Sequence, residues 1–303
     1  MDDLANCTLD TCPASQSIYG YRPNLGVDIF FVIVYSSIVS YCLYIISREK
    51  KGWLSYNIAI ILGSLLELVG FVARIYGYVD PFVNIPWILQ YTFLTIAPVF
   101  MTAAIYVCIG RLADYLGRGL FNIRPRLYAR IFIPSDILAL LIQSSGGGLS
   151  SSEKDSVDEG VTAGQSIIIS GLALQVISLT IFFLLFLAVV GPARLFLPRG
   201  HRSGKLSRAD RRVRTFVILV SVAILLIIGR SVYRTVEFSQ GIYSPLGHKE
   251  VLFIILDGFP MAIATSILVL FHPVHMIPST PRAVSGHELG YLPNHAQYRA
   301  VYT

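Results

Sequence analysis

Apolar residues gather into seven long stretches along this chain, and short polar segments separate them. Each stretch has 20 residues or more, enough for a helix to cross a hydrocarbon layer of about 30 Å. The pattern predicts an all-α membrane protein, a seven-helix bundle over residues 25–272. An N-terminal tail (1–24) and a disordered C-terminal tail (273–303) are expected outside it. The expected spans are 25–47, 54–78, 85–110, 127–149, 161–190, 213–238 and 247–272.

Composition agrees with one membrane domain. Hydrophobic residues make up 54% of the 303 residues and charged residues 14%, against about 25% charged in soluble domains. The net charge is +6, but the basic excess lies in short loops between apolar stretches. It forms no stripe or helix face, so nucleic-acid binding is set aside.

The distribution of lysine and arginine predicts the orientation. The fourth stretch is the least apolar, and omitting it would leave six spans. With seven spans, 18 basic residues fall on one side of the membrane and three on the other, Arg22, Lys154 and Lys249. The positive-inside rule then puts the N-terminus outside and the C-terminus in the cytosol. We expect a plasma-membrane protein, with an endomembrane location as the alternative.

The N-terminal tail offers two small features. It begins Met1, Asp2, Asp3 with no basic region before an apolar run, so no cleavable signal peptide is expected. Asn6 starts a glycosylation sequon on the segment expected outside. Cys7 and Cys12 lie in the same tail and could pair locally, whereas Cys42 and Cys108 lie in spans.

Polar and ionisable side chains occur within six of the spans. An ionisable group at mid-membrane costs at least about 2.5 to 3.5 kcal/mol, so such residues should face the bundle interior and have partners. In four helices the outermost polar residues are seven positions apart, which places each set on one face. We expect these stripes to line a polar cavity that opens from outside. Mutual salt bridges and hydrogen bonds that hold the bundle together are the alternative. The candidate pathway residues are Glu67, Arg74, Gln90, Asp136, Gln143, Gln175, Arg230, Arg234, Glu237, Glu250 and Asp257.

The fourth span carries a candidate hinge. Pro134 removes a backbone donor, and Gly146, Gly147 and Gly148 make a poor helix end. Such interruptions are tolerated where backbone lines a cavity. The alternative is an ordinary frayed helix terminus.

Several catalytic chemistries lack their residues. The segment from Gly200 to Lys205 is one residue too short for a phosphate-binding loop and lacks the Ser or Thr that should follow. His272 and His275 flank Pro273 at the end of the last span, too few for a zinc site. No nucleophile motif of the Gly-x-Ser-x-Gly kind is present. We therefore expect no enzyme activity, no cofactor and no metal.

The order and spacing of residues between Tyr21 and Pro273 resemble the fungal aminocholesterol-resistance-like proteins, also called the lipid-translocating exporter family. That family commonly has Tyr where this chain has Phe71. The resemblance implies a seven-span fungal membrane protein, linked in relatives to release of sphingoid long-chain bases and to resistance against toxic amphiphiles. The residues that carry it are Tyr21, Pro23, Glu67, Gly70, Arg74, Gln90, Ala97, Pro98, Tyr106, Gly110, Arg111, Asp136, Gln143, Gly147, Gly148, Gly171, Gln175, Arg230, Tyr233, Arg234, Glu237, Gly241, Glu250, Asp257, Pro260, Met261 and Pro273.

Two functions remain in view. The first is an exporter of a cationic amphiphile that hydrolyses no ATP, in which Glu237 and Asp257 pair with the amine. The second is a seven-helix receptor-like lipid sensor or regulator of lipid asymmetry. A rhodopsin-like receptor is disfavoured, because Leu112 replaces the Tyr expected after Gly110 and Arg111, and the last span has no Asn-Pro-x-x-Tyr. Membrane lipids and an amphiphilic small molecule are the expected partners, and the oligomeric state is left open.

Overall fold

The computed structural model describes residues 12–13, 17, 19–48, 52–116, 126–152, 163–190, 208–240 and 249–277. Seven helical segments in these ranges are long and apolar enough to cross a membrane, which confirms the expected seven-helix bundle. Asn6, Cys7 and the C-terminal tail from residue 278 lie outside the described residues, so the glycosylation prediction stays untested. The helices are α1 (Leu25–Arg48), α2 (Leu54–Val79), α3 (Asn84–Leu116), α4 (Arg126–Ser152), α5 (Ala163–Val190), α6 (Arg208–Ser239), α7 (Glu250–Phe253), η4 (Ile254–Gly258), α8 (Phe259–Leu270) and α9 (Pro273–Met276).

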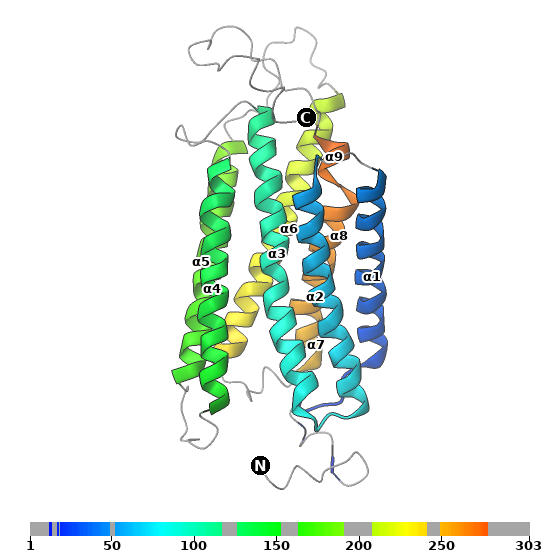
Figure 1. The fold of residues 1–303 in the computed structure, drawn as a ribbon, viewed down its shortest axis with the longest axis vertical. Coiled ribbons are helices and arrows are strands. Elements are labelled where there is room, and N and C mark those ends of the chain that lie inside the picture. The colour runs from blue at the N-terminus through cyan, green and yellow to red at the C-terminus, as the bar shows by residue number, and fades with distance from the viewer. Residues whose placement is uncertain are drawn as a thin grey trace, which may run out of the picture.

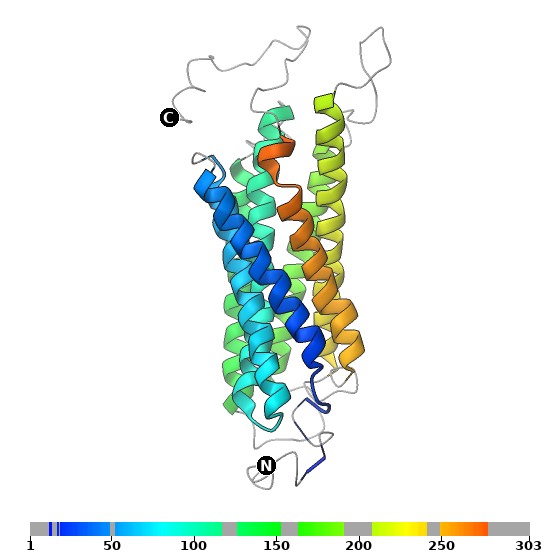
Figure 2. The same ribbon diagram turned by 90° about the vertical axis from the view of Figure 1, so that its right-hand side faces the viewer.

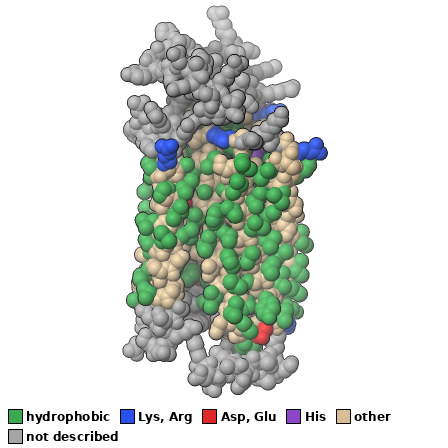
Figure 3. Space-filling view, in the orientation of Figure 1, with side chains coloured by type: hydrophobic (Ala, Val, Ile, Leu, Met, Phe, Trp, Pro, Cys, Tyr) green, Lys and Arg blue, Asp and Glu red, His purple; other side chains and the backbone are tan. Residues whose placement is uncertain are grey.

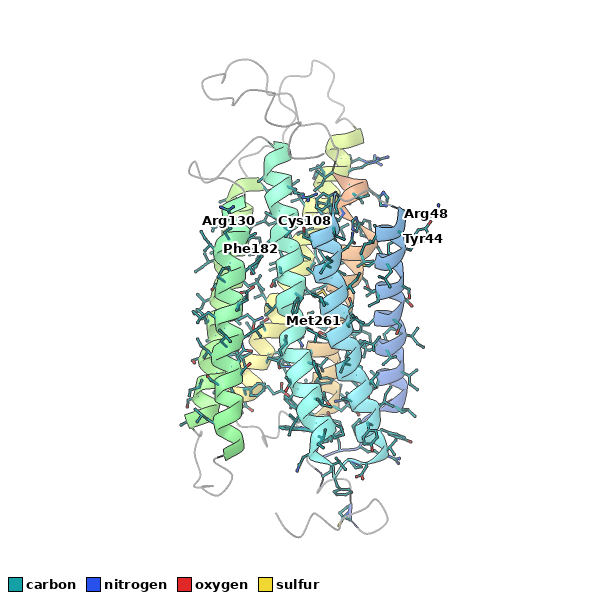
Figure 4. The ribbon with its side chains drawn as sticks, viewed as in Figure 1. Tyr44, Arg48, Cys108, Arg130, Phe182 and Met261 are labelled. Atoms are coloured by element: carbon teal, nitrogen blue, oxygen red, sulfur yellow. The ribbon has the colours of Figure 1, made fainter. Side chains whose placement is uncertain are left out.

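The helices lie roughly parallel or antiparallel along one long axis (Figures 1 and 2). Helices α1, α2 and α3 are neighbours, α4 packs mainly on α5, and α6 contacts both α5 and α8. The N-terminal end of the bundle, at the bottom of Figure 1, holds the first residues of α1, α3 and α5. The opposite end, here called the basic end, carries Arg48 and Arg130 (Figure 4).

On the face seen in Figure 3, apolar side chains predominate between these two ends. Ile33, Leu141 and Val251 are each more than half exposed, which suits contact with lipid tails rather than water. Inside, Phe31 of α1 stacks on Phe71 of α2 with ring centroids 4.5 Å apart. The bundle therefore has an apolar exterior, an aromatic core and polar groups buried within it.

The seventh span is one helix with a wide turn in its middle. Segments α7, η4 and α8 are continuous, and η4 is a π-helical turn in which the Phe259 N–H bonds to the Ile254 carbonyl. Pro260 follows directly and has no N–H, so the regular hydrogen-bond ladder loses a donor there. Single π-turns occur frequently at functional sites, and this one carries Asp257.

Helix α4 is not interrupted, contrary to the expected break. It continues through Pro134 and all three glycines to Ser152. A Cβ added to Gly146 would lie 2.6 Å from the Gly164 carbonyl oxygen of α5, whereas one added to Gly147 or Gly148 would meet nothing within 4 Å. Gly146 therefore permits close packing of α4 on α5. A hinge role for Pro134 and the glycines stays a prediction.

Both expected tails contribute ordered residues to the bundle. The described structure continues to residue 277, past the expected boundary at 272, because His272 caps α9 and Pro273 is buried. At the other terminus, Tyr19 is buried and the Arg22 Nε donates to the Tyr78 carbonyl at the end of α2. Cys12 is disulfide-bonded.

Candidate functional site

The first buried polar group surrounds Arg74 of α2 at the N-terminal end. Its Nε lies 2.8 Å from Asp28 Oδ1 of α1, and its Nη2 lies 2.7 Å from Glu250 Oε1 of α7. Nη1 donates to the Tyr21 hydroxyl at 3.2 Å. The same Glu250 oxygen accepts the Asn24 backbone N–H. The Arg74 cluster (Arg74, Asp28, Glu250, Tyr21) thus ties α1, α2, α7 and the N-terminal segment together.

A second group surrounds Arg234 of α6. Its Nε and Nη2 contact the two carboxylate oxygens of Asp257 at 2.7 and 2.8 Å, a bidentate pair. Its Nη1 lies 3.1 Å from Glu237 Oε2, and the Tyr91 hydroxyl of α3 donates to Glu237 Oε1 at 3.3 Å. Arg230 adds a second cation, with its Nε 3.0 Å from Asp257 Oδ1. The Arg234 cluster (these five residues) joins α3, α6 and η4.

The two clusters meet across one aromatic ring. The Phe253 ring centroid lies 4.4 Å from the Arg74 guanidinium carbon and 5.4 Å from that of Arg234. Both guanidinium groups are within the range of cation–π attraction. Glu67 of α2 is more loosely bound, since its Oε1 lies 3.9 Å from Arg230 Nη2. The charged groups at this end therefore form one nearly continuous network.

A third polar group lies apart from these arginines. The Asp136 carboxyl of α4 is 1% exposed, and its Oδ2 is 2.9 Å from the Tyr106 hydroxyl and 3.0 Å from Thr102 Oγ1, both on α3. Ser178 of α5 places a third hydroxyl beside it. None of the ion pairs in the described part of the chain includes Asp136.

Buried amides connect the remaining helices. Gln143 of α4 donates to Gln175 Oε1 of α5 at 3.2 Å, and Gln165 of α5 donates to the Phe238 carbonyl of α6 at 2.6 Å. Gln90 of α3 is buried, and its Oε1 has no partner. These contacts extend the polar interior from the arginine network to the α4–α5 pair.

The basic end has its own buried contact. His272 is fully buried, its Nδ1 accepts the Val274 N–H, and its Nε2 lies 3.0 Å from Asn57 Oδ1 of α2. Because Nδ1 accepts, the ring proton is on Nε2 and donates to Asn57. Burial, with a smaller contribution from His275, lowers the pKa of His272 to about 4. Within the described ranges, no three His, Cys, Asp or Glu side chains converge as metal ligands.

The eleven predicted pathway residues fall into separate groups. Ten are buried and Glu250 is partly exposed. Four ion-pairing residues of the last two spans and Glu67 meet in or beside the Arg234 cluster, Arg74 and Glu250 meet in the first cluster, and Gln143 meets Gln175. Asp136 and Gln90 belong to none of these groups. Whether these residues form a pathway remains a prediction, because the contacts are also those of a structural network.

Sequence reasoning missed the partners of the predicted residues. Asp28 is the clearest omission: it lies in the first turn of α1 and was not among the candidate residues, yet it is 1% exposed and pairs with Arg74. An ionisable residue inside a predicted span was itself a signal. The hydroxyls of Tyr21, Tyr91 and Tyr106 could not be distinguished in the sequence from ordinary aromatic core residues.

Comparisons with known proteins give a consistent result. Residues 60–280 match the family described as RTA1 like protein. The chain is 31% identical over 314 residues, 91% of its length and 80% of the other's, to a protein of Saccharomyces cerevisiae named "Sphingoid long-chain base transporter RSB1". It is 27% identical to the yeast "Protein RTA1" over 85% of each chain. It is 30% identical to the yeast "Protoporphyrin uptake protein 1" over 66% of this chain and 62% of that protein. No solved structure matches.

Proposed function

The chain belongs to the RTA1-like family, and from that premise we propose that it moves cationic amphiphiles across a membrane without ATP hydrolysis. Sphingoid long-chain bases are the proposed cargo. The observation that carries this proposal is the likeness to a yeast protein named as a sphingoid long-chain base transporter, over 91% of this chain. Release of such bases would confer the resistance to toxic amphiphiles that we expect.

The buried polar interior supports this function. A cargo with a charged amine and an apolar chain needs polar contacts within the bundle and an apolar path beside them. Buried carboxyl, hydroxyl and amide groups reach all the long helices, in a protein whose outer surface is apolar. In stable membrane bundles, polar groups inside the hydrocarbon layer are commonly functional.

The proposed orientation places the N-terminal end outside the cell and the basic end in the cytosol, in the plasma membrane. The exposed Arg48 and Arg130 lie at the basic end, which agrees with the positive-inside rule. Both arginine clusters then lie in the outer half of the bilayer. We propose that they hold the outer ends of the helices together and separate when cargo leaves.

Neither Glu237 nor Asp257 is free to receive an amine in the conformation described. Both oxygens of Asp257 are engaged by Arg234, and Arg230 adds a third contact. A cationic cargo would have to displace a guanidinium group from that carboxylate. We therefore propose that these two carboxylates hold the outer ends of the helices together. The amine of the cargo then binds to a different group.

The alternative is a receptor-like lipid sensor. The network of buried ion pairs favours it, because such contacts also hold a signalling bundle in one state until a lipid shifts the balance. A sensor binds its lipid without moving it across the membrane, so translocation separates the two functions.

The deciding experiment uses the purified full chain in vesicles. A fluorescent sphingoid base is added to the outer leaflet, and its movement to the inner leaflet is followed by quenching with an impermeant reductant. We expect faster movement than in protein-free vesicles, with a neutral N-acyl analogue as the cargo control. Equal rates with and without protein would reject the translocator and favour the sensor.

A further inference from the structure

Asp136 differs from the other buried carboxylates by having no resident cation. Asp28, Glu237, Glu250 and Asp257 each have an arginine nitrogen within 3.1 Å, and Glu67 has one at 3.9 Å. Among the described residues, Asp136 instead bonds to the hydroxyl groups of Thr102 and Tyr106. An ionised carboxylate buried without a cation is strongly unfavourable. A bound proton, or a cation from elsewhere, would remove this cost.

The hydroxyl groups beside Asp136 can form hydrogen bonds with its carboxyl in both the protonated and the ionised state. Thr102 has one hydroxyl hydrogen, yet its Oγ1 lies 3.0 Å from Asp136 Oδ2 and 2.9 Å from the Val99 carbonyl. When the carboxyl is protonated on Oδ2, it donates to Thr102, which donates to Val99. When it is ionised, Thr102 rotates its hydrogen toward Oδ2, and Tyr106 donates in both cases. Exchange of the proton needs no movement of the helices.

Two further polar atoms at the site lack partners. Asp136 Oδ1 and Ser178 Oγ are buried and make no hydrogen bond of good geometry, although the Ser178 hydroxyl is close enough to bond to the carboxyl after a small adjustment. Unsatisfied buried polar atoms are uncommon and require an explanation. Both can accept hydrogens, and an alkylammonium group has three N–H donors on a single positive charge. The vacant acceptors therefore match a primary amine.

The surroundings make the site asymmetric along the bundle axis. Toward the basic end it is covered by three packed rings, Tyr106, Phe132 and Phe182, with centroid distances of 4.4 to 5.6 Å. Figure 4 shows Phe182 in the upper half of the bundle, below Arg130. Toward the N-terminal end, the next buried polar side chains are Gln143 on α4 and Gln175 on α5. On that side the molecular surface is also recessed between α4 and α3 (Figure 3).

No other charged group faces Asp136 from the described parts of the helices packed around it. Helix α5 has no ionisable residue from Ala163 to Val190, and Tyr106 is the ionisable contact from α3. Arg130 of α4 is exposed at the basic end, and Arg111 of α3 lies over the Trp53 ring with 4.3 Å to its centroid. Proton exchange at this site is therefore controlled by Asp136 and its hydroxyl neighbours.

From this geometry we propose that Asp136, with Ser178, Thr102 and Tyr106, binds the ammonium group of the cargo in exchange for a proton. This inference rests on the proposed function and names its binding site. In the exchange, the Asp136 O–H bond breaks, the proton leaves to water, and the carboxylate pairs with the intact alkylammonium. The hydroxyl groups of a sphingoid base, which flank its amine, can bond to Ser178 and Thr102. Return of a proton releases the amine and completes the cycle.

The first test measures protons released when amine binds. Purified full chain in detergent at pH 5 and weak buffer is mixed with sphinganine, and a pH-sensitive dye reports released protons while binding is measured separately. We expect about one proton per bound amine for the unmodified chain and none for Asp136→Asn. The matched control is Asp80→Asn, which changes a carboxyl of the same type between α2 and α3 and should release as much as the unmodified chain.

Asn at position 136 keeps an acceptor for Tyr106 and Thr102 and gains a donor for Ser178, so its thermal midpoint should stay within a few degrees. If that variant does not fold, Ser178→Ala and Asp136→Glu decide. Ser178→Ala should weaken amine binding roughly fivefold to tenfold with unchanged proton release per bound amine. Asp136→Glu should keep proton release. Full affinity in Ser178→Ala, or no proton release by the unmodified chain, would overturn the assignment.

A second test separates this site from the proposed function. In vesicles, a gradient of one pH unit should drive up to roughly tenfold protein-dependent accumulation for a one-to-one exchange, and Asp136→Asn should abolish it. If the rate of translocation is changed neither by the gradient nor by Asp136→Asn, the Asp136 site is rejected and the translocator function is retained. Binding with proton release but no translocation would reject the translocator and keep the site.

Discussion

Arg234 on α6 holds both carboxylate oxygens of Asp257 on η4, through Nε at 2.7 Å and Nη2 at 2.8 Å. Both residues are 1% exposed. A two-fold contact of this kind fixes the relative position of the two helices as well as pairing their charges. Removal of Asp257 would leave Arg234 with Glu237 as its one remaining carboxylate, and Arg230 with the more distant Glu67.

Asp257→Asn should therefore lower the stability of the protein, and not only the tolerance of cells to a toxic sphingoid base. Breaking a buried ion pair costs about 3 to 5 kcal/mol, and here two arginines lose the same carboxylate. We expect a lower thermal midpoint in detergent and less protein in the membrane, and Arg234→Met combined with Asp257→Leu should recover part of the loss. A control is Asp80→Asn. Normal abundance with lost tolerance would instead return Asp257 to the cargo site.

The three glycines of α4 should respond differently to alanine. Gly146→Ala places its Cβ 2.6 Å from the Gly164 carbonyl oxygen, so α4 and α5 must separate and the thermal midpoint should fall. Gly147→Ala with Gly148→Ala meets open space and favours the helix by about 1 kcal/mol per residue. If this segment bends during transport, the double variant will slow translocation in vesicles with little change in binding. An unchanged rate would remove the hinge.

Orientation can be tested with single cysteines. In a background without the native four cysteines, we expect a cysteine at Ser152 to react with an impermeant reagent in intact cells and one at Ser203 to be protected. Position 203 follows the span α5, on the side that holds most loop arginines. Equal labelling at both positions in sealed cells would reject the proposed topology, and permeabilised cells provide the positive control.

Acid should weaken the contact between α2 and the end of the seventh span. Burial lowers the pKa of His272 from 6.5 to about 4, so the folded state holds the neutral ring. Its contribution to stability is complete above pH 6.5 and is lost as the pH falls toward 4. We expect the thermal midpoint to fall over this interval, and His272→Gln to reduce the slope. An identical slope in both proteins would contradict this assignment.

The number and approximate ends of the seven spans could be predicted because apolar length is a direct requirement of the bilayer. The burial of most polar residues followed from the same cost of exposing charge to lipid. Their pairing could not be predicted, because it depends on the rotation of each helix. Glu67 and Arg74 lie seven residues apart on α2, yet one lies near Arg230 and the other pairs with Asp28.

The expected interruption of α4 was wrong for a related reason. Glycine is a poor helix former in isolation, but at Gly146 the absence of a side chain permits α5 to approach closely. Packing of this kind is common between membrane helices. Sequence composition gives the local helix propensity of a segment. It does not show which neighbouring helix will pack against that segment and override the propensity.

The π-turn Ile254–Gly258 sets the direction of two carboxylates. In a regular α-helix, Glu250 and Asp257 would lie on one face, since seven residues make two turns less about 20°. Asp257 lies within the wide turn, which departs from the 3.6-residue period, and the two carboxylates reach different helices: Glu250 contacts Arg74 of α2, and Asp257 contacts Arg234 of α6. Deleting one residue from this turn would nearly preserve the composition and length of the span yet turn Asp257 away from Arg234 and leave that cluster incomplete. In this segment the number of residues in the turn, as well as the identity of the side chains, sets which arginine a carboxylate can reach.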